Sequence, residues 1–283
     1  MSKQKKSVDP SVYTKKYYLS DCTGFEEFKK SYGEELEPRF KEFIKHFKIT
    51  KDMKILDIGC GRGEMVLYAA KQGADSIGID YSIDAIKLAR LARDKKNKKL
   101  RNRMEFYVMN AKQMKFKDFT FDTIIITDVI EHLYDDELNA VFSEIYRVLK
   151  KNGILVIHTA PNKLFNEITY KYYSYPVSTF LVNLWNFITG KKYPNIARPE
   201  LLKTSSHEIM HVNEPTYFSL RDIFRKHKFK GSIVSSNITV KKEVLGLKDI
   251  IFNFVVFLHP FSKFFPLNIL YGSDFISVLK ISK

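Results

Sequence analysis

The chain has 283 residues, of which 45% are hydrophobic, and its 47 Lys and Arg against 32 Asp and Glu give a net charge of +15. This length suits one domain of about 200 to 250 residues with additional segments. The two cysteines, Cys22 and Cys60, exclude a disulfide framework and fit a reducing cytoplasm, and no apolar run is long enough to span a bilayer. Residues 1–6 also lack the apolar core of a signal peptide, so we expect a cytoplasmic protein.

The N-terminal segment is polar, basic and interrupted by Pro10, which predicts a disordered tail over residues 1–16 ahead of a domain at 17–283. Three tyrosines lie around this boundary, namely Tyr13, Tyr17 and Tyr18. Two alternatives are open for these rings: they form a lid over a cationic ligand, or they pack on the domain surface. Residues 34–47 carry apolar side chains at helical spacing and should form a helix that packs on a sheet.

A strand followed by a glycine-rich turn comes next. Residues 54–58 form a short apolar run that predicts a buried strand, and a helix should begin at Glu64. The glycines between them let the backbone turn sharply and approach a ligand. A dinucleotide-binding turn places a pyrophosphate at the helix N-terminus, but here Asp57 precedes the turn and Glu64 takes its sixth position. Two carboxylates would repel a pyrophosphate, so a ligand with a cationic end fits better.

The motif Asp57-Ile58-Gly59-Cys60-Gly61-Arg62-Gly63 resembles the first motif of the class I S-adenosylmethionine-dependent methyltransferases. The resemblance extends to the small-molecule methyltransferases of the ubiquinone pathway and is specific from about residue 36 to 162. In that family the glycine turn packs against the methionine part of the cofactor, and the acidic residue at the strand end helps to hold its ammonium group. The resemblance therefore implies contacts to S-adenosyl-L-methionine from Asp57, Gly59, Cys60, Gly61 and Gly63.

A second short strand, residues 76–80, ends at Asp80. An acidic residue about 20 positions after such a glycine turn commonly accepts hydrogen bonds from ribose hydroxyls, so we assign Asp80 and the adjacent Tyr81 to the cofactor. The alternative is that Asp80 and Ser82 only cap the next helix.

A dense basic run occupies residues 87–103, in which Asp94 is the acidic residue. The run suggests a solvated helix face, an attraction to anionic membranes or substrates, or nucleic-acid binding. No aromatic side chain is interleaved to stack on bases, so nucleic acid is disfavoured.

The third strand, residues 104–109, ends at Asn110. In the resembling family an acidic residue near this place accepts a hydrogen bond from the adenine amino group. The resemblance therefore implies that Asn110 contacts adenine through its side-chain carbonyl and that Ala111 forms an apolar wall. Core packing explains Ala111 equally well.

The fourth strand, residues 121–128, is almost continuously apolar and is followed by Asp128, Glu131 and His132. In a helical turn these three side chains share one face. The segment resembles one in the ubiquinone-pathway O-methyltransferases and the small-RNA 3′-end methyltransferases, in some of which it helps to hold a divalent metal.

Three hypotheses follow for the catalytic candidates Asp128, Glu131 and His132. In the first, His132 is a general base that Glu131 orients. In the second, a metal bound with help from His207 and His211 activates the acceptor. In the third, the segment has no direct role in the reaction and only begins a helix and contacts the cofactor, a contact that we also assign to Asp128. We favour the metal-free hypothesis.

The remaining chain predicts a helix after Asp135, a strand at 154–158, a helix at 220–227, a strand near 233–240 and an antiparallel last strand at 274–281. The fold class is thus α/β, a Rossmann-like seven-stranded, mainly parallel sheet with helices on both faces and a cofactor-binding core at 34–160.

Two insertions complete this domain. Residues 161–215 form a helical cap over the site, and the apolar residues 245–270 precede the last strand. The second insertion either lies in a membrane interface or packs against the cap.

From the resemblance we expect a methyltransferase that uses S-adenosyl-L-methionine and acts on a small-molecule, sugar or lipid-linked acceptor, with a hydroxyl oxygen as the nucleophile. The alternatives are an RNA methyltransferase and a non-catalytic module that binds at a membrane-associated assembly. A peripheral membrane contact remains open, and the sequence does not define an oligomeric state.

Overall fold

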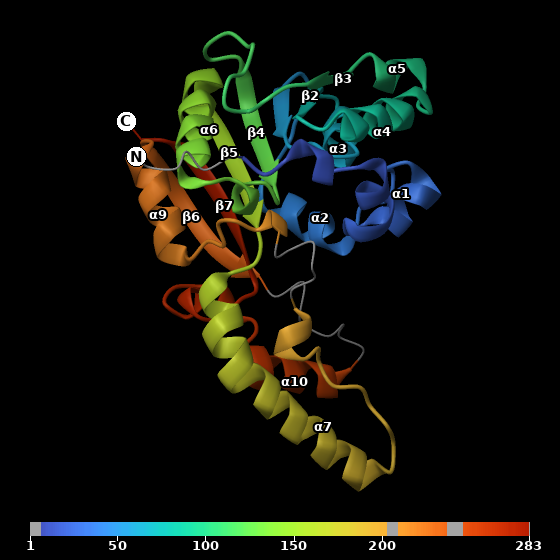
Figure 1. The fold of residues 1–283 in the computed structure, drawn as a ribbon, viewed down its shortest axis with the longest axis vertical. Coiled ribbons are helices and arrows are strands. Elements are labelled where there is room, and N and C mark those ends of the chain that lie inside the picture. The colour runs from blue at the N-terminus through green and yellow to red at the C-terminus, as the bar shows by residue number, and fades with distance from the viewer. Residues whose placement is uncertain (1–6, 203–208, 237–245, 283) are drawn as a thin grey trace.

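The computed structural model describes residues 7–202, 209–236 and 246–282. Its sheet has the strand order β3-β2-β1-β4-β5-β7-β6 (Figure 1). The strands are β1 Lys54–Ile58, β2 Asp75–Asp80, β3 Met104–Val108, β4 Phe121–Thr127, β5 Leu149–Thr159, β6 Phe229–Ser236 and β7 Asp274–Ile281. β7 runs antiparallel to both β5 and β6, whereas the pairings among β1 to β5 are parallel. The predicted fold class is confirmed.

Helices cover both faces of this sheet, which explains why β4 is apolar at successive positions. Ile124 and Ile126 face the cluster that includes α6 (Asp135–Val148) and α9 (Tyr217–Lys226). Ile125 faces the other cluster, with α2 (Pro38–Phe43) and α3 (Glu64–Lys71). Alternate side chains of a strand point to opposite faces, so a strand buried on both faces loses the polar alternation.

Several element boundaries differ from the sequence prediction, among them that of the strand expected near 233–240, which begins four residues earlier as β6. The helix expected over 34–47 is limited to α2 and a 3₁₀ turn at Ile44–His46. The helix α6 ends at Val148, and β5 begins directly at Leu149, ahead of the strand predicted at 154–158, with Gly153 inside it. A Cβ at Gly153 would lie 2.7 Å from the Leu149 side chain, at the point where the register between β4 and β5 shifts. Glycine therefore permits a bulge here.

Residues 7–16 are folded against the domain, so for them the predicted disordered tail over 1–16 is wrong, and residues 1–6 lie outside the described residues. Pro10–Val12 form a 3₁₀ helix capped by Asp9, and a π-helical turn at Tyr17–Asp21 and α1 (Phe25–Ser31) follow. Val8 and Tyr13 are buried against α4 (Ile83–Asp94). The short helix α5 (Lys98–Arg101) follows α4.

The two insertions pack against each other. The first contains a π-helical stretch, Phe165–Ser174, that continues into α7 (Tyr175–Thr189), and the second contains α10 (Leu247–Phe257). The Ser174 hydroxyl donates to the Val256 carbonyl at 2.8 Å. We call α7, α10 and residues 165–174 and 190–202 the arm, which projects from the sheet in Figure 1. Within the described residues, no helix has the length and apolar character needed to cross a membrane.

Candidate active site

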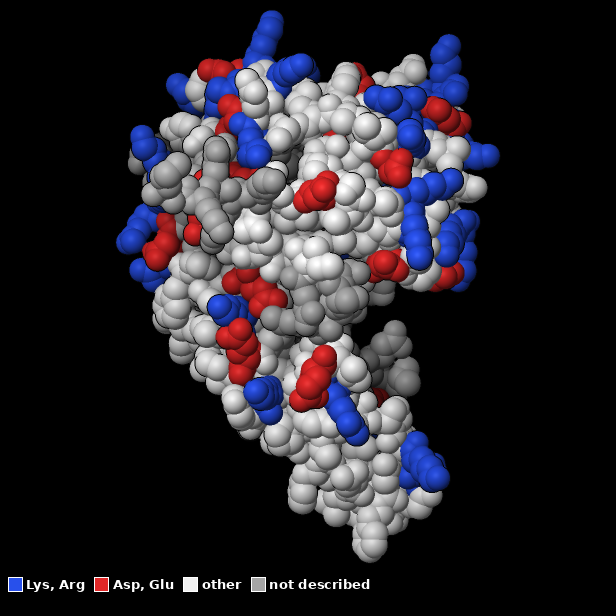
Figure 2. Space-filling view, viewed as in Figure 1, with Lys and Arg blue, Asp and Glu red and all other residues white. Residues whose placement is uncertain are grey.

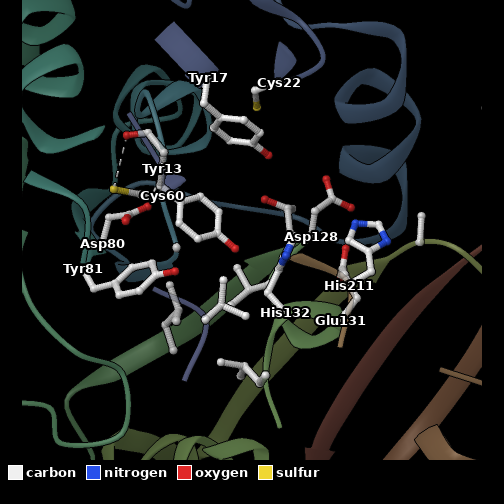
Figure 3. Close-up of a pocket in the computed structure, with 18 of the residues that line it drawn as sticks. Tyr13, Tyr17, Cys22, Cys60, Asp80, Tyr81, Asp128, Glu131, His132 and His211 are labelled. Carbon is white, nitrogen blue, oxygen red and sulfur yellow. Dashed lines mark hydrogen bonds between the residues drawn. The ribbon is translucent and has the colours of Figure 1, made fainter. Parts of the chain in front are cut away.

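A cavity of about 510 Å³ lies beyond the C-terminal ends of the parallel strands. Its walls come from the glycine turn after β1, the ends of β2 and β4, the N-terminal tyrosines and the base of the arm. Figure 3 shows the rings of Tyr13, Tyr17 and Tyr81 on one side and Glu131, His132 and His211 on the other. This size and position are typical of a site for a cofactor and a small substrate in an open α/β sheet.

The glycine turn forms one wall through its backbone. Gly59 has a φ of +70°, and a Cβ there would lie 2.3 Å from a methyl carbon of Val129. Gly61 has a φ of +51° and faces Tyr18, whose ring would lie 3.6 Å from an added Cβ. Because side chains are excluded here, a ligand can approach the peptide groups of Gly59, Cys60 and Gly61 directly.

Two of the residues assigned to the cofactor, Asp57 and Gly63, do not line this cavity. A Cβ at Gly63 would lie 2.8 Å from the Phe106 ring, so this glycine permits close packing of α3. Asp57 lies beneath the turn, and its Oδ1 has no hydrogen-bond partner among the described residues. Burial, with Glu64 and Asp80 nearby, raises the pKa of Asp57 well above its usual value. The structure therefore does not support a direct contact from either residue.

Asp80 supports the start of α4 and can also bind a cofactor, which were the two alternatives that the sequence left open. Its Oδ2 accepts from the Gly61 amide at 3.0 Å and its Oδ1 from the Ser82 amide at 2.8 Å. Ser82 is the N-cap of α4 and accepts from the Ala85 amide. Each carboxylate oxygen keeps a second lone pair, so Asp80 can still accept from ligand hydroxyls. Burial raises the pKa of Asp80 to about 6.

Asn110, Ala111 and Tyr81 also line the cavity. The Asn110 side-chain oxygen already accepts from the Lys112 amide at 2.9 Å. The contact between Asn110 and adenine therefore stays a prediction. It would use the second lone pair of the same oxygen.

Arg62, to which the sequence analysis assigned no separate role, binds the backbone of the N-terminal segment beside the cavity. Its guanidinium donates to the Tyr18 carbonyl at 2.8 Å and to the Thr23 carbonyl at 2.7 Å, and it pairs with Glu64 at 2.7 Å. The sequence feature that could have indicated this role is an arginine inside the glycine turn with a carboxylate two positions later. Tyr13, Tyr17 and Tyr18 all line the cavity and also pack in a hydrophobic cluster of the domain, so the two alternatives for these rings are compatible.

Asp128 belongs to a buried chain of charges that joins distant elements. Its carboxylate pairs with Arg39 and lies 2.7 Å from His158 Nδ1, and His158 Nε2 lies 3.1 Å from Asp274. Burial opposes ionisation of Asp128, but Arg39 and His158 outweigh it and hold its pKa well below its usual value. Burial alone would lower the pKa of His158, but Asp128 and Asp274 raise it to about 9.

The segment after β4 does not form the expected helical face. Asp128 has a φ of +53°, and the 3₁₀ turn begins only at Ile130. Because Asp128 is held as an ionised partner of two cations, it is poorly suited to remove a proton. The condition for a shared helical face is therefore not met, although Asp128, Glu131 and His132 all line the cavity.

Glu131 and His132 stand next to each other at the cavity wall with different environments. Glu131 is buried and accepts from the Thr159 hydroxyl at 2.8 Å, and burial, with Asp128, raises its pKa to about 8. His132 Nδ1 lies 3.1 Å from the Met210 carbonyl. A carbonyl can only accept, so Nδ1 carries the proton in the neutral ring and Nε2 is the basic nitrogen.

Glu131, His132 and His211 form the group that could hold a metal ion. One ligand atom from each lies within 4.8 Å of the others. Asp128 is outside this group, and His207 lies outside the described residues. The structure thus brings together three of the five residues named for the metal hypothesis.

The sheet with its reversed strand β7, the glycine turn after β1 and the carboxylate that ends β2 define a class I S-adenosylmethionine-dependent methyltransferase fold. Residues 56–157 match the family model described as a methyltransferase domain. Residues 56–157 are therefore similar to methyltransferase domains, and the chain has the fold of such enzymes.

Known proteins agree with this assignment. The ubiquinone biosynthesis O-methyltransferase of Pelagibacter ubique is 35% identical over 125 residues, 42% of this chain and 49% of that protein. Phosphoethanolamine N-methyltransferase 3 of Arabidopsis thaliana is 33% identical over 118 residues, 41% of this chain and 23% of that protein. The chain thus spans about half the length of the first relative and less of the second.

A solved methyltransferase from Methanosarcina mazei has the same fold. It superposes with a TM-score of 0.53 at 22% identity and covers 88% of this chain and 100% of its own.

Proposed function

We propose that this protein transfers a methyl group from S-adenosyl-L-methionine to a hydroxyl oxygen of a small-molecule, sugar or lipid-linked acceptor, with His132 as the general base. The observation that carries the proposal is the position of His132, which faces the cavity with its Nδ1 fixed by the Met210 carbonyl. The cofactor, when bound, supplies a methyl group on a cationic sulfur. One of the named relatives is an O-methyltransferase and the other an N-methyltransferase, so they do not decide the nucleophile. The choice of oxygen therefore depends on His132 alone.

The residues around the cavity fit this cofactor. The open backbone at Gly59 and Gly61 accommodates its amino-acid part, and Asp80 can accept from its ribose hydroxyls. The faces of Tyr13 and Tyr17 attract a cation through their ring electrons. Together these groups give a nucleoside with a positively charged tail both hydrogen-bond acceptors and charge complementarity.

His132 is arranged to take the proton of an acceptor hydroxyl. The Met210 carbonyl holds the neutral ring with Nδ1 protonated, which leaves Nε2 as the basic nitrogen. Glu131, with a pKa of about 8, is neutral at pH 7 and adds little negative charge beside the ring. Pro161, shortly after β5, and Leu202, at the base of the arm, line the same cavity and can align the acceptor.

The test is methyl transfer from labelled cofactor into a fractionated cell extract, with His132→Gln as the variant. We expect its rate to fall by about 100-fold or more while cofactor affinity is retained, because the base is lost and the cofactor contacts are not. The matched control is His46→Gln, which lies outside the cavity. A label found on nitrogen or carbon in the product, or an unchanged rate in His132→Gln, would contradict the proposal.

A metal-assisted version is the second candidate, favoured by the grouping of Glu131, His132 and His211. A divalent ion held there would lower the pKa of the acceptor hydroxyl and orient it. His132 cannot be both a metal ligand and the base through the same nitrogen. We therefore expect EDTA treatment followed by removal of the chelator to leave the transfer rate unchanged. Loss of activity that Mn²⁺, Mg²⁺ or Zn²⁺ restores would favour the metal version.

A further inference from the structure

The arm carries a large group of exposed apolar side chains. Single exposed apolar residues are common on soluble proteins, but a contiguous group marks an interaction surface. The arm residues concerned are Ile168, Tyr172, Phe180, Leu184, Trp185, Phe187, Ile188, Leu247, Ile250, Ile251 and Phe254. Phe187 is 87% exposed and Ile188 is 66% exposed at adjacent positions near the end of α7.

This exposure remains after the arm has formed its own core. One side of α7 and α10 packs around Tyr170, Val256 and Phe257, together with Ile196 from the returning loop. Along α7 only Ser178 and Val182 are fully buried, and the helix contains no charged residue from Tyr175 to Thr189. A helix that is apolar on its outward sides is favoured by an apolar environment.

Cations and amphipathic rings border this apolar surface. Lys191 and Lys192 follow the end of α7 and are exposed, and Lys248 lies over the Tyr193 ring at 4.9 Å. Trp185 is partly exposed on α7 itself. At a membrane surface, lysines contact the lipid phosphates, Trp and Tyr lie at the interface, and apolar side chains reach the acyl chains. The side chains at this end of the arm include all three kinds.

Figure 2 shows few charged groups on this side of the arm, whereas Lys and Arg are dense on the body. The arm is therefore distinguished from the rest of the molecule by its apolar character and not by a higher density of positive charge. The basic run on α4 and α5 lies at the opposite end of the molecule from the arm in Figure 1. That run serves as an internal control for nonspecific attraction to anionic lipids.

We propose that the arm docks this protein on an anionic lipid bilayer. The apolar side chains near the end of α7 enter the boundary between headgroups and acyl chains, and Lys191 and Lys192 contact lipid phosphates. No described helix can cross the membrane, so the arm lies in one leaflet. Leu201 and Leu202, at the base of the arm, line the cavity, so the arm is continuous with one wall of the cavity. The docking does not depend on the proposed methyl transfer.

The experiment is sedimentation of the full chain with phosphatidylcholine vesicles, with or without 30% phosphatidylglycerol. We expect binding to the mixed vesicles that weakens as salt is raised, and much weaker binding to pure phosphatidylcholine. The variant Phe187→Ser/Ile188→Ser should lose about tenfold or more in partitioning, because buried apolar area is removed. Lys191→Gln/Lys192→Gln should lose about tenfold on the anionic vesicles only.

Matched controls sit on the body. Ile83→Ser removes an apolar side chain that is 59% exposed on α4, and Lys98→Gln/Lys99→Gln removes two exposed lysines from α5. Both should retain binding, and all variants should retain their melting temperature and their affinity for S-adenosylhomocysteine. Absence of vesicle binding, or equal losses in the control variants, would overturn the proposal. Dimers in sedimentation velocity that dissociate in Phe187→Ser/Ile188→Ser, without vesicle binding, would assign the arm to a second copy of this chain instead.

Discussion

Asp80→Ala should lower the affinity for S-adenosyl-L-methionine by about 100- to 10,000-fold. Hydrogen bonds to a charged group contribute about 1.5–3 kcal/mol each, and the ionised Asp80 can accept from two ribose hydroxyls. The same carboxylate accepts from the Gly61 amide, so the variant also loosens the glycine turn. Calorimetric titration with the cofactor and with S-adenosylhomocysteine measures the effect.

The pH dependence of binding provides an internal check on this prediction. The pKa of Asp80 is about 6 in the free protein, so its carboxylate becomes protonated and a poorer acceptor as the pH falls through 6. Cofactor affinity should therefore decrease below that pH in the wild type and depend less on pH in Asp80→Ala. Asp75→Ala, at the exposed start of the same strand, is the control. Full affinity in a folded Asp80→Ala protein would contradict the assignment of this residue.

The core of the fold could be predicted because its signals are local. The run of Ile124, Ile125 and Ile126 identifies a strand buried on both faces, and the glycines after Asp57 identify the turn and the helix that follows. Each signal lies within a few residues and depends on strand and helix periodicity or on the conformations that glycine alone adopts freely. The sheet order follows from the family resemblance that these motifs carry.

The site was predicted less completely because its contacts join distant parts of the chain. Tyr13 is buried by residues of α4 and by Met210, which the sequence alone does not place beside it. Asp128 seemed suited to catalysis until its partners were known, since Arg39 and His158 come from other elements. A residue's pKa and its capacity to act as a base are properties of such contacts and not of the residue type.

The buried charges around Asp128 should also set the stability of the fold. His158→Gln removes one cation and leaves Asp128 and Asp274 without it, and breaking a buried ion pair typically costs about 3–5 kcal/mol in the free energy of unfolding. Asp128 still keeps Arg39, and Asp274 still accepts from Ser236 and Ser273, so we expect a folded but less stable protein. Chemical denaturation at pH 6.5 measures the difference.

The pH dependence of stability follows from the same residue. The pKa of His158 is about 9 in the folded protein and 6.5 ordinarily, so the imidazolium stabilises the fold fully below pH 6.5 and its contribution is lost as the pH rises through 9. The loss amounts to roughly 3 kcal/mol between these limits. Glu131, whose pKa is raised to about 8, also lowers stability as the pH rises toward 8, so the comparison with His158→Gln isolates the histidine.

His227→Gln is the matched control, because burial, with Lys226 nearby, lowers the pKa of His227 and keeps it from titrating in this window. Its unfolding free energy should fall between pH 6.5 and 9.5 as steeply as that of the wild type, whereas His158→Gln should show a shallower fall. Equal slopes in the wild type and in His158→Gln would mean that His158 is neutral in the folded protein. A neutral ring could then donate to only one of the Asp128 and Asp274 carboxylates, and Arg39 would be the remaining cation beside the carboxylate at the end of β4.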